Sequence, residues 1–190
     1  QHIDYALLTH CDRDHISGIQ ALLEKNPSIS LSHLILPASA LEDHRYDLLK
    51  RLAYNHGADI SYWQKGDELV FSEQGICLPT KVNAMAENST IAENSTMAEN
   101  HATTKKGWPY TKDHQLHIRC FYPNDSSHIE EANAHSIGCL LTYGHFRMLF
   151  TGDMPKEAEE ALLENCREAE VSPVVDVLKL AHHGSKTSSY

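Results

Sequence analysis

Two short apolar runs, at residues 3–8 and 31–36, predict the strands of the first third of the chain. The first run has little polarity on either face, which is typical of a strand that is covered on both faces. Between them an apolar stripe at residues 21–23 predicts a helix from about Ile16 to Glu24, ended by Asn26-Pro27. The order strand, helix, strand predicts a parallel pair joined by a right-handed crossover.

The pattern continues with further helices and strands along the chain. Leucines at helical spacing predict a second helix over residues 41–55, with Gly57 as its C-terminal cap. A third helix is expected from residue 155 to about residue 167. Strands are expected at residues 59–63, 68–71, 76–82, 114–122, 137–143, 147–151 and 174–180.

One segment does not fit this pattern. The six-residue units AENSTI, AENSTM and AENHAT follow one another over residues 86–103 and contain little that could enter a core. Their period is too short for the unit of a repeat protein. We therefore expect a disordered insertion at about residues 83–112, within a single domain that spans residues 1–190.

Charge and cysteine content narrow the possible classes of protein. The chain has 26 acidic residues and 16 Lys or Arg residues, and its formal net charge of -10 argues against broad binding of nucleic acid by a basic surface. Five cysteines without regular spacing predict free thiols rather than disulfides. No apolar run is long enough to cross a bilayer.

Imidazole and carboxylate side chains gather directly after the first expected strand. His10, Asp12, Asp14 and His15 fall within six positions. Residues two apart in an extended segment point the same way, so His10 and Asp12 can face one point. Asp14 and His15, on the expected turn into the helix, can face a second point. These side chains suit Zn, Mn or Fe, so the stretch predicts a site for one or two metal ions rather than a solvated loop.

Later positions offer further ligands at strand ends. His135 precedes an expected strand, where it could bind a metal or donate a hydrogen bond. Asp153 follows a strand and a glycine, so it could reach the metal or cap the helix that begins near residue 155. His182 and His183 end the last expected strand. Because neighbours on a strand point opposite ways, only one of the two is expected to bind metal.

The segment after these two histidines predicts a phosphate contact. Gly184, Ser185 and Lys186 read as the start of a helix, whose free N–H groups and lysine ammonium could hold a phosphate. The alternative is an ordinary helix cap at Ser185. Arg13 and Lys179, which are close in sequence to the expected metal ligands, could also meet backbone phosphates.

Residues 8–18, LTHCDRDHISG, resemble the His-x-His-x-Asp-His signature of the metallo-β-lactamase fold, with Asp12 in place of the second histidine. This variant resembles the hydrolase domains of the ComEC family of competence proteins and of its stand-alone relatives. Three later segments share the resemblance: NAHS at 133–136, LFTGD at 149–153 and DVLKLAHHGSKTS at 176–188. The resemblance covers most of the chain outside about residues 82–112. It implies an α/β fold, a metallo-β-lactamase-like αββα sandwich, which we expect to be truncated at both ends.

The resemblance also implies a dinuclear metal-dependent hydrolase, a phosphodiesterase or nuclease acting on single-stranded DNA in the manner of ComEC-like domains. Two divalent metal ions, Zn or Mn, would stabilise hydroxide near neutral pH, and Asp153 would bridge them. A remaining histidine could protonate the leaving group. The metal ligands would be His10, Asp12, Asp14, His15, His135, Asp153 and His182, the catalytic residues Asp14 and His183, and the phosphate contacts Ser185 and Lys186.

Two alternatives stay open. A small-molecule hydrolase of the same fold, acting on a lactone, a thioester or a cyclic phosphodiester, fits the acidic net charge better. A non-catalytic domain that binds metal or a partner would fit the replaced second histidine. No stable protein partner is expected, and contact with a membrane is expected only through segments outside this sequence. The expected location is the cytoplasm for a stand-alone protein, or the extracytoplasmic face of a bacterial membrane within a ComEC-like protein.

Overall fold

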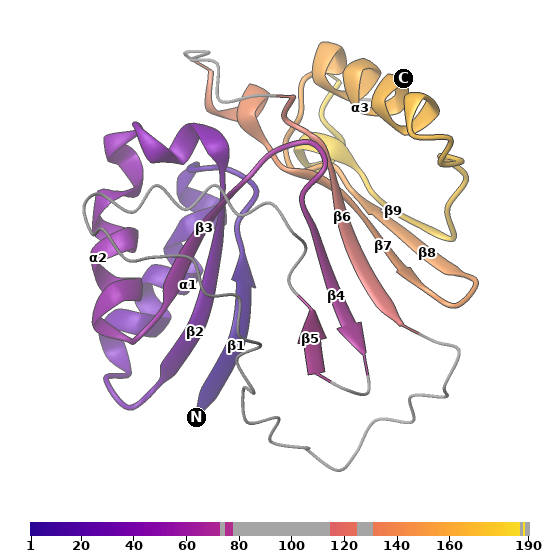
Figure 1. Cartoon of the computed structure of the whole chain (residues 1–190). Helices are drawn as coiled ribbons and strands as arrows, with labels where there is room; N and C mark the ends of the chain where they lie inside the picture. The colour runs from indigo at the N-terminus through magenta and orange to yellow at the C-terminus, as the bar shows by residue number, and fades with distance from the viewer. Residues whose placement is uncertain (73–74, 78–114, 125–130, 187, 189–190) are drawn as a thin grey trace, which may run out of the picture.

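The computed structural model describes residues 1–72, 75–77, 115–124, 131–186 and 188, which form a mixed α/β chain with two sheets. Its helices are α1 (Arg13–Lys25), α2 (Asp47–Asn55) and α3 (Lys156–Glu168). Figure 1 shows the sheets side by side, with α1 and α2 on the outer side of one and α3 against the other. The α/β prediction is confirmed. Within these residues, every helix falls short of the length and hydropathy that crossing a bilayer requires.

The first sheet is parallel, as the sequence predicts. It contains β1 (His2–Leu7), β2 (Ser30–Pro37) and β3 (Asp59–Trp63), in that order. Leu7 lies opposite Ile35, and Leu36 lies opposite Tyr62. Helices α1 and α2 make the two crossovers, so the carboxyl ends of all three strands lie at the same edge of the sheet.

Helix α1 begins at Arg13, earlier than the expected start near Ile16. The Asp12 carbonyl accepts hydrogen bonds from His15 N–H and Ile16 N–H, at 2.9 and 3.0 Å, and so starts the helix soon after the strand. Asp14 then lies in the first turn, where the helix dipole favours a carboxylate. The prediction that Asp14 and His15 lie on a turn before the helix is therefore wrong, because both are helical.

The helix expected over residues 41–55 is shorter than predicted. Two 3₁₀ turns, Ala38–Leu41 and His44–Tyr46, precede α2. Asp43 caps the second of these turns and so stabilises it in place of an α-helix. Its carboxylate accepts a hydrogen bond from Arg45 backbone N–H at 2.9 Å and pairs with the Arg45 guanidinium at 2.7 Å. Gly57 follows the helix with φ of +84°, which confirms the predicted cap.

The second sheet has the strand order β5-β4-β6-β7-β8-β9. Neighbours are antiparallel except β8 and β9, which run parallel. The last strand is shorter than the predicted 174–180: only Val177, Leu178 and Lys179 pair with β8, at the edge of the sheet. The insertion expected at about residues 83–112 lies outside the described residues. The strands are β4 (Glu68–Ser72), β5 (Gly75–Cys77), β6 (Leu116–Tyr122), β7 (Gly138–Tyr143), β8 (Phe146–Phe150) and β9 (Val177–Lys179).

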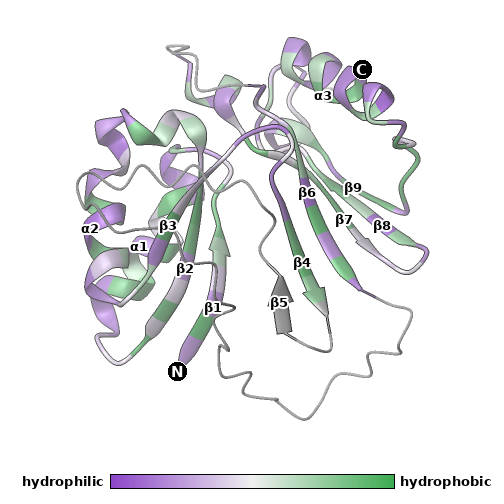
Figure 2. Ribbon diagram, viewed as in Figure 1, coloured by the Kyte–Doolittle hydropathy of each residue, from purple (hydrophilic) through white to green (hydrophobic). Residues whose placement is uncertain are grey.

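Three buried clusters hold these layers together. One, which includes Leu23 and Leu49, lies between the first sheet and helices α1 and α2. A second lies under α3 and includes Leu162. The third contains Trp63 from the first sheet and Leu69 from the second, so it fills the space between the sheets. Figure 2 shows the strands of both sheets rich in hydrophobic residues and the helices with mixed faces, as expected for helices that cover sheets.

Leu49 and Leu48 are neighbours on α2 with 0% and 43% exposure. Replacing Leu49 by Ala leaves a cavity in the first cluster and should lower the free energy of unfolding by about 2–5 kcal/mol. Leu48→Ala is the matched control and should change it by less than about 0.5 kcal/mol. Urea denaturation followed by circular dichroism measures both values, and equal losses would contradict this packing.

Candidate metal centre

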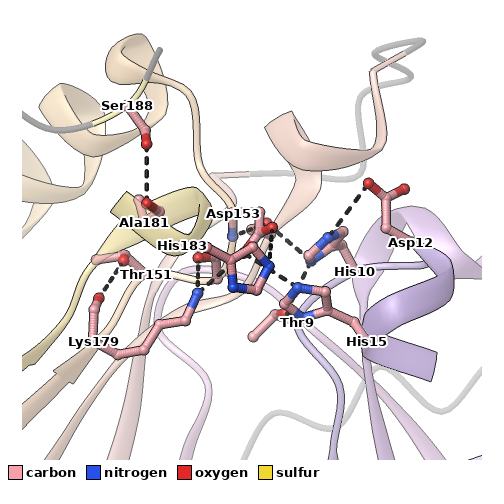
Figure 3. A network of polar contacts seen from close by, with 12 residues as sticks. Thr9, His10, Asp12, His15, Thr151, Asp153, Lys179, Ala181, His183 and Ser188 are labelled. Carbon is pink, nitrogen blue, oxygen red and sulfur yellow. Dashed lines mark hydrogen bonds and ion pairs between the residues drawn. The ribbon is translucent and has the colours of Figure 1, made fainter. Parts of the chain in front are cut away.

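Polar side chains from three chain segments meet where strands end (Figure 3). The segment after β1 carries His10 and Asp12, and the first turn of α1 carries His15. The loop between β8 and α3 carries Asp153, and the 3₁₀ turn after β9 carries His183. Both sheets therefore contribute to one cluster of imidazoles and carboxylates.

Asp14, His15, Asp153 and His183 form a compact group whose ligand atoms all lie within 4.8 Å of one another. Nε2 of His183 lies 3.1 Å from Asp14 Oδ2 and 3.2 Å from Asp153 Oδ2. Nε2 of His15 lies 3.3 Å from Asp153 Oδ1. Two imidazoles and two carboxylates are a donor set that suits Zn or Mn, so these residues fit a divalent cation.

Two enclosed imidazole nitrogens at this site make no hydrogen bond: Nε2 of His10 and Nε2 of His15. The first lies 3.8 Å from Asp12 Oδ2, which is beyond hydrogen-bond reach. The second is near Asp153 but is not aligned with it. The two rings are neighbours, with centroids 4.0 Å apart. Because buried polar atoms are almost always paired, two such nitrogens together indicate a place for a cation.

Asp153 lies within this group and is 3% exposed. Lys179 Nζ donates to its Oδ1 at 3.0 Å and also to the Gly152 carbonyl. Burial raises the pKa of Asp153, but the Lys179 hydrogen bond and the charges of His15 and Lys179 outweigh it, so the pKa ends below its ordinary value. Asp153 is thus an ionised carboxylate, and Lys179 binds it rather than an open phosphate position.

The alternative role for Asp153, as the cap of the next helix, is wrong. The N-cap of α3 is Pro155, and no side chain makes a capping hydrogen bond there. The Asp153 carboxylate points instead toward His15, Lys179 and His183, as Figure 3 shows.

His10 is fully buried beside this group. Burial, and next the charge of His15, lower the pKa of His10 to about 4, against the opposing pull of the nearby carboxylates. The ring is therefore neutral near pH 7 and keeps a nitrogen lone pair, as a metal-binding imidazole must.

His182 and His183 lie in a turn after the last strand rather than on it. Both have left-handed backbone, with φ of 45° and 54°, which is uncommon for residues other than glycine. The turn brings His183 into the compact group and leaves His182 outside it. The resemblance implies His182 as the metal ligand and His183 as a catalytic residue, a choice that the spacing itself leaves open, and the structure places His183 against the carboxylates.

His10, Asp12 and His135, the other predicted ligands, lie outside the four-residue group in the described part of the chain. His135 ends the 3₁₀ turn Ala132–His135, just before β7, and is 4% exposed. Asp12 is the N-cap residue of α1, with extended backbone, and its side chain makes no capping hydrogen bond there. Their part in metal binding stays a prediction.

Ser185 and Lys186, the predicted phosphate contacts, follow the turn that holds the two histidines. Ser185 N–H donates to the His182 carbonyl at 2.9 Å, and the Ser185 carbonyl accepts from Ser188 N–H at 3.1 Å. Lys186 is exposed. A helix starting here would continue into residues outside those described, so the phosphate site stays a prediction.

Two hydroxyl residues that sequence reasoning left without a role contact the site directly. Thr9 Oγ1 lies 3.0 Å from His10 Nδ1, and Ser136 Oγ accepts from Asp153 N–H at 3.0 Å. Both belong to the stretches that carry the family resemblance. A hydroxyl next to each of two histidines, His10 and His135, is the signal that could have identified them.

No protein-family model matches the sequence. The chain is similar to ComE operon protein 3 from Bacillus subtilis (strain 168), with 23% identity over 189 residues. The match covers 98% of this chain and 18% of that protein, so the chain spans less than a fifth of the length of this relative. The similarity extends over all the segments that form the site.

Gly152 lies where two site loops approach most closely. Its φ is +56°, and a Cβ atom there would lie 2.6 Å from Ser136 Cβ and 3.1 Å from Thr9 Cβ. Gly152→Ala thus meets both a left-handed backbone and a clash, and should lower the free energy of unfolding by about 2–5 kcal/mol. Gly66→Ala, with φ of +98° and open space around the Cβ position, is the control.

The control should lose only about 1–2 kcal/mol, because it meets the backbone penalty alone. Urea denaturation compares the two variants. A loss in Gly152→Ala no larger than in Gly66→Ala would show that the loops do not approach in this way.

Proposed function

We propose that this chain is a metal-dependent hydrolase that cleaves phosphodiester bonds, with single-stranded DNA as its substrate class. The observation that carries the proposal is the convergence of Asp14, His15, Asp153 and His183 beside the unpaired Nε2 of His10. Two sheets with helices on their outer sides support a metallo-β-lactamase-like αββα sandwich. We propose residues 1–190 as a single domain of that type.

The compact group would hold one divalent cation, Zn or Mn. His183, rather than His182, is the ligand in this proposal, because its Nε2 lies near both carboxylates. Asp153 would serve two cations, since it contacts His15 and His183 of the compact group and its charge also acts on His10. When bound, such cations supply Lewis acidity, which stabilises negative charge on a phosphoryl oxygen.

A second cation would be held by His10, Asp12 and His135 together with Asp153. The support is that His10 is buried, neutral and unpaired at Nε2, and that Asp12 Oδ2 is 3.8 Å from that nitrogen. This donor set, two imidazoles and two carboxylates, matches that of the compact group. Either set suits Zn or Mn.

Asp14 and His182 are the groups proposed to assist the reaction. Asp14 is exposed, and a hydrogen bond from backbone N–H lowers its pKa, which favours its ionised form. Besides binding the cation, this carboxylate would orient an attacking water by accepting a hydrogen bond from it. His182, next to the group but outside it, would protonate the leaving oxygen. Ser185 and Lys186 would contact the phosphate at the rim.

The net charge of -10 favours a second candidate, a hydrolase of a lactone, thioester or cyclic phosphodiester. Such a small substrate needs no extended basic surface, whereas a DNA strand is held mainly through its phosphates. Both candidates use the same metal centre and differ in the substrate that binds there. A metal-binding domain without activity is the third outcome that the tests below distinguish.

Removing one carboxylate of the compact group should remove the metal. Elemental analysis of protein purified without added metal should give about two equivalents of Zn or Mn for the wild type, most of them lost in Asp14→Ala. Asp4→Ala removes an exposed carboxylate on β1 and is the matched control, expected to keep the metal. Wild-type protein that binds no divalent cation would overturn the proposal.

Labelled single-stranded DNA, duplex DNA and a small phosphodiester should be compared as substrates of the metal-loaded chain. Single-stranded DNA should be cleaved best, and chelation should stop the reaction. Asp153→Asn should lower the rate by more than the roughly 10- to 100-fold that residues outside the ligand set typically contribute. Hydrolysis of a lactone or thioester without DNA cleavage would favour the second candidate, and metal binding without any hydrolysis would favour the third.

A further inference from the structure

Two hydroxyl groups, those of Thr9 and Ser136, lie close to Nδ1 of His10 in the candidate metal centre. Thr9 Oγ1 lies 3.0 Å from this nitrogen, and Ser136 Oγ lies 3.3 Å from it. The same Thr9 oxygen lies 3.4 Å from Nδ1 of His15. One threonine hydroxyl therefore touches both imidazoles on the same side of each ring, and Figure 3 shows it below the two histidines.

The opposite nitrogens of these rings are the two enclosed Nε2 atoms without a hydrogen-bond partner. A neutral imidazole carries its proton on one nitrogen and a lone pair on the other. A proton on Nε2 would leave a buried N–H donor unpaired in each ring, at a cost of about 1–3 kcal/mol apiece. A proton on Nδ1 is paired with a hydroxyl oxygen instead, and both lone pairs then lie at Nε2.

We propose that Thr9, assisted by Ser136, is a positioning residue that holds His10 and His15 as Nδ1–H tautomers, so that the Nε2 lone pair of each ring is available to the cation that the ring would bind. This inference rests on the proposed metal site. A hydroxyl oxygen has two lone pairs, so Thr9 can accept from both Nδ1–H groups at once. Partners of this kind on the far side of a ligand histidine fix its tautomer and ring orientation.

The backbone keeps the two hydroxyls in place. The Thr9 carbonyl accepts from Ile137 N–H at 2.9 Å, which ties the end of β1 to the residue before β7. Ser136 is fully buried, and its Oγ accepts from Asp153 N–H at 3.0 Å. The two hydroxyls thus connect His10 and His15 to the loop that carries Asp153. A substitution of Thr9 should therefore affect both imidazoles.

Heteronuclear NMR of the histidine ring nitrogens in the metal-free protein tests the tautomer directly. We expect Nδ1 of His10 and of His15 to be protonated and both Nε2 atoms to be unprotonated. A proton on Nε2 of either ring would overturn the inference. The measurement needs no bound cation, so it decides the inference even if the chain binds no metal and the proposed function fails.

The dissociation constant for Zn, measured by competition with a chelator, tests the effect on binding. Thr9→Val keeps the shape of the side chain but removes the acceptor, and should raise the constant about 10- to 100-fold. Thr9→Ser keeps the hydroxyl and should stay near the wild-type value. Thr142→Val, on β7 and outside the site, is the control for the substitution itself.

Wild-type affinity in Thr9→Val, or equal weakening in Thr9→Ser and Thr9→Val, would overturn the positioning role. Circular dichroism checks that each variant is folded. If Thr9→Val does not fold, the tautomers of the wild-type protein and the affinity of Thr9→Ser still decide the question, because neither depends on that variant.

Discussion

The site depends on a junction between the two sheets. The Ile137 N–H group donates to the Thr9 carbonyl, and this backbone hydrogen bond joins the end of one sheet to the beginning of a strand in the other. A buried cluster that includes Trp63 and Leu69 holds the sheets together behind it. Because the proposed ligands come from segments attached to strands of both sheets, the separation of the sheets at this junction sets the distances among the side chains.

Contacts within the protein keep the cluster together. Asp14 and Asp153 would repel each other if nothing stood between them, since both are ionised. His183 lies between the two carboxylates, and the Lys179 ammonium holds Asp153 from the other side. The geometry that a cation would use is therefore supported by contacts of the protein itself, which reduces the rearrangement that binding requires.

Local patterns in the sequence predict the strands, the parallel unit and the cluster at residues 10–15. They fail where the bounds of a helix depend on individual hydrogen bonds: the Asp12 backbone carbonyl starts α1 before Ile16, and the Asp43 carboxylate keeps the chain in a 3₁₀ turn before α2. Because neighbours on a strand point opposite ways, the sequence predicts that His182 and His183 face different directions as strand residues. The two histidines lie instead in a turn with left-handed backbone. The roles of Thr9 and Ser136 depend on contacts across the fold, which no local pattern contains.

The left-handed backbone at His182 and His183 has a consequence for how this chain can vary. Each such residue costs about 1–2 kcal/mol when it carries a side chain, and glycine or asparagine would accept the conformation more easily. Selection for thermal stability alone would therefore drive these positions away from histidine. Related chains that kept both imidazoles would show that something other than stability maintains histidine at this turn.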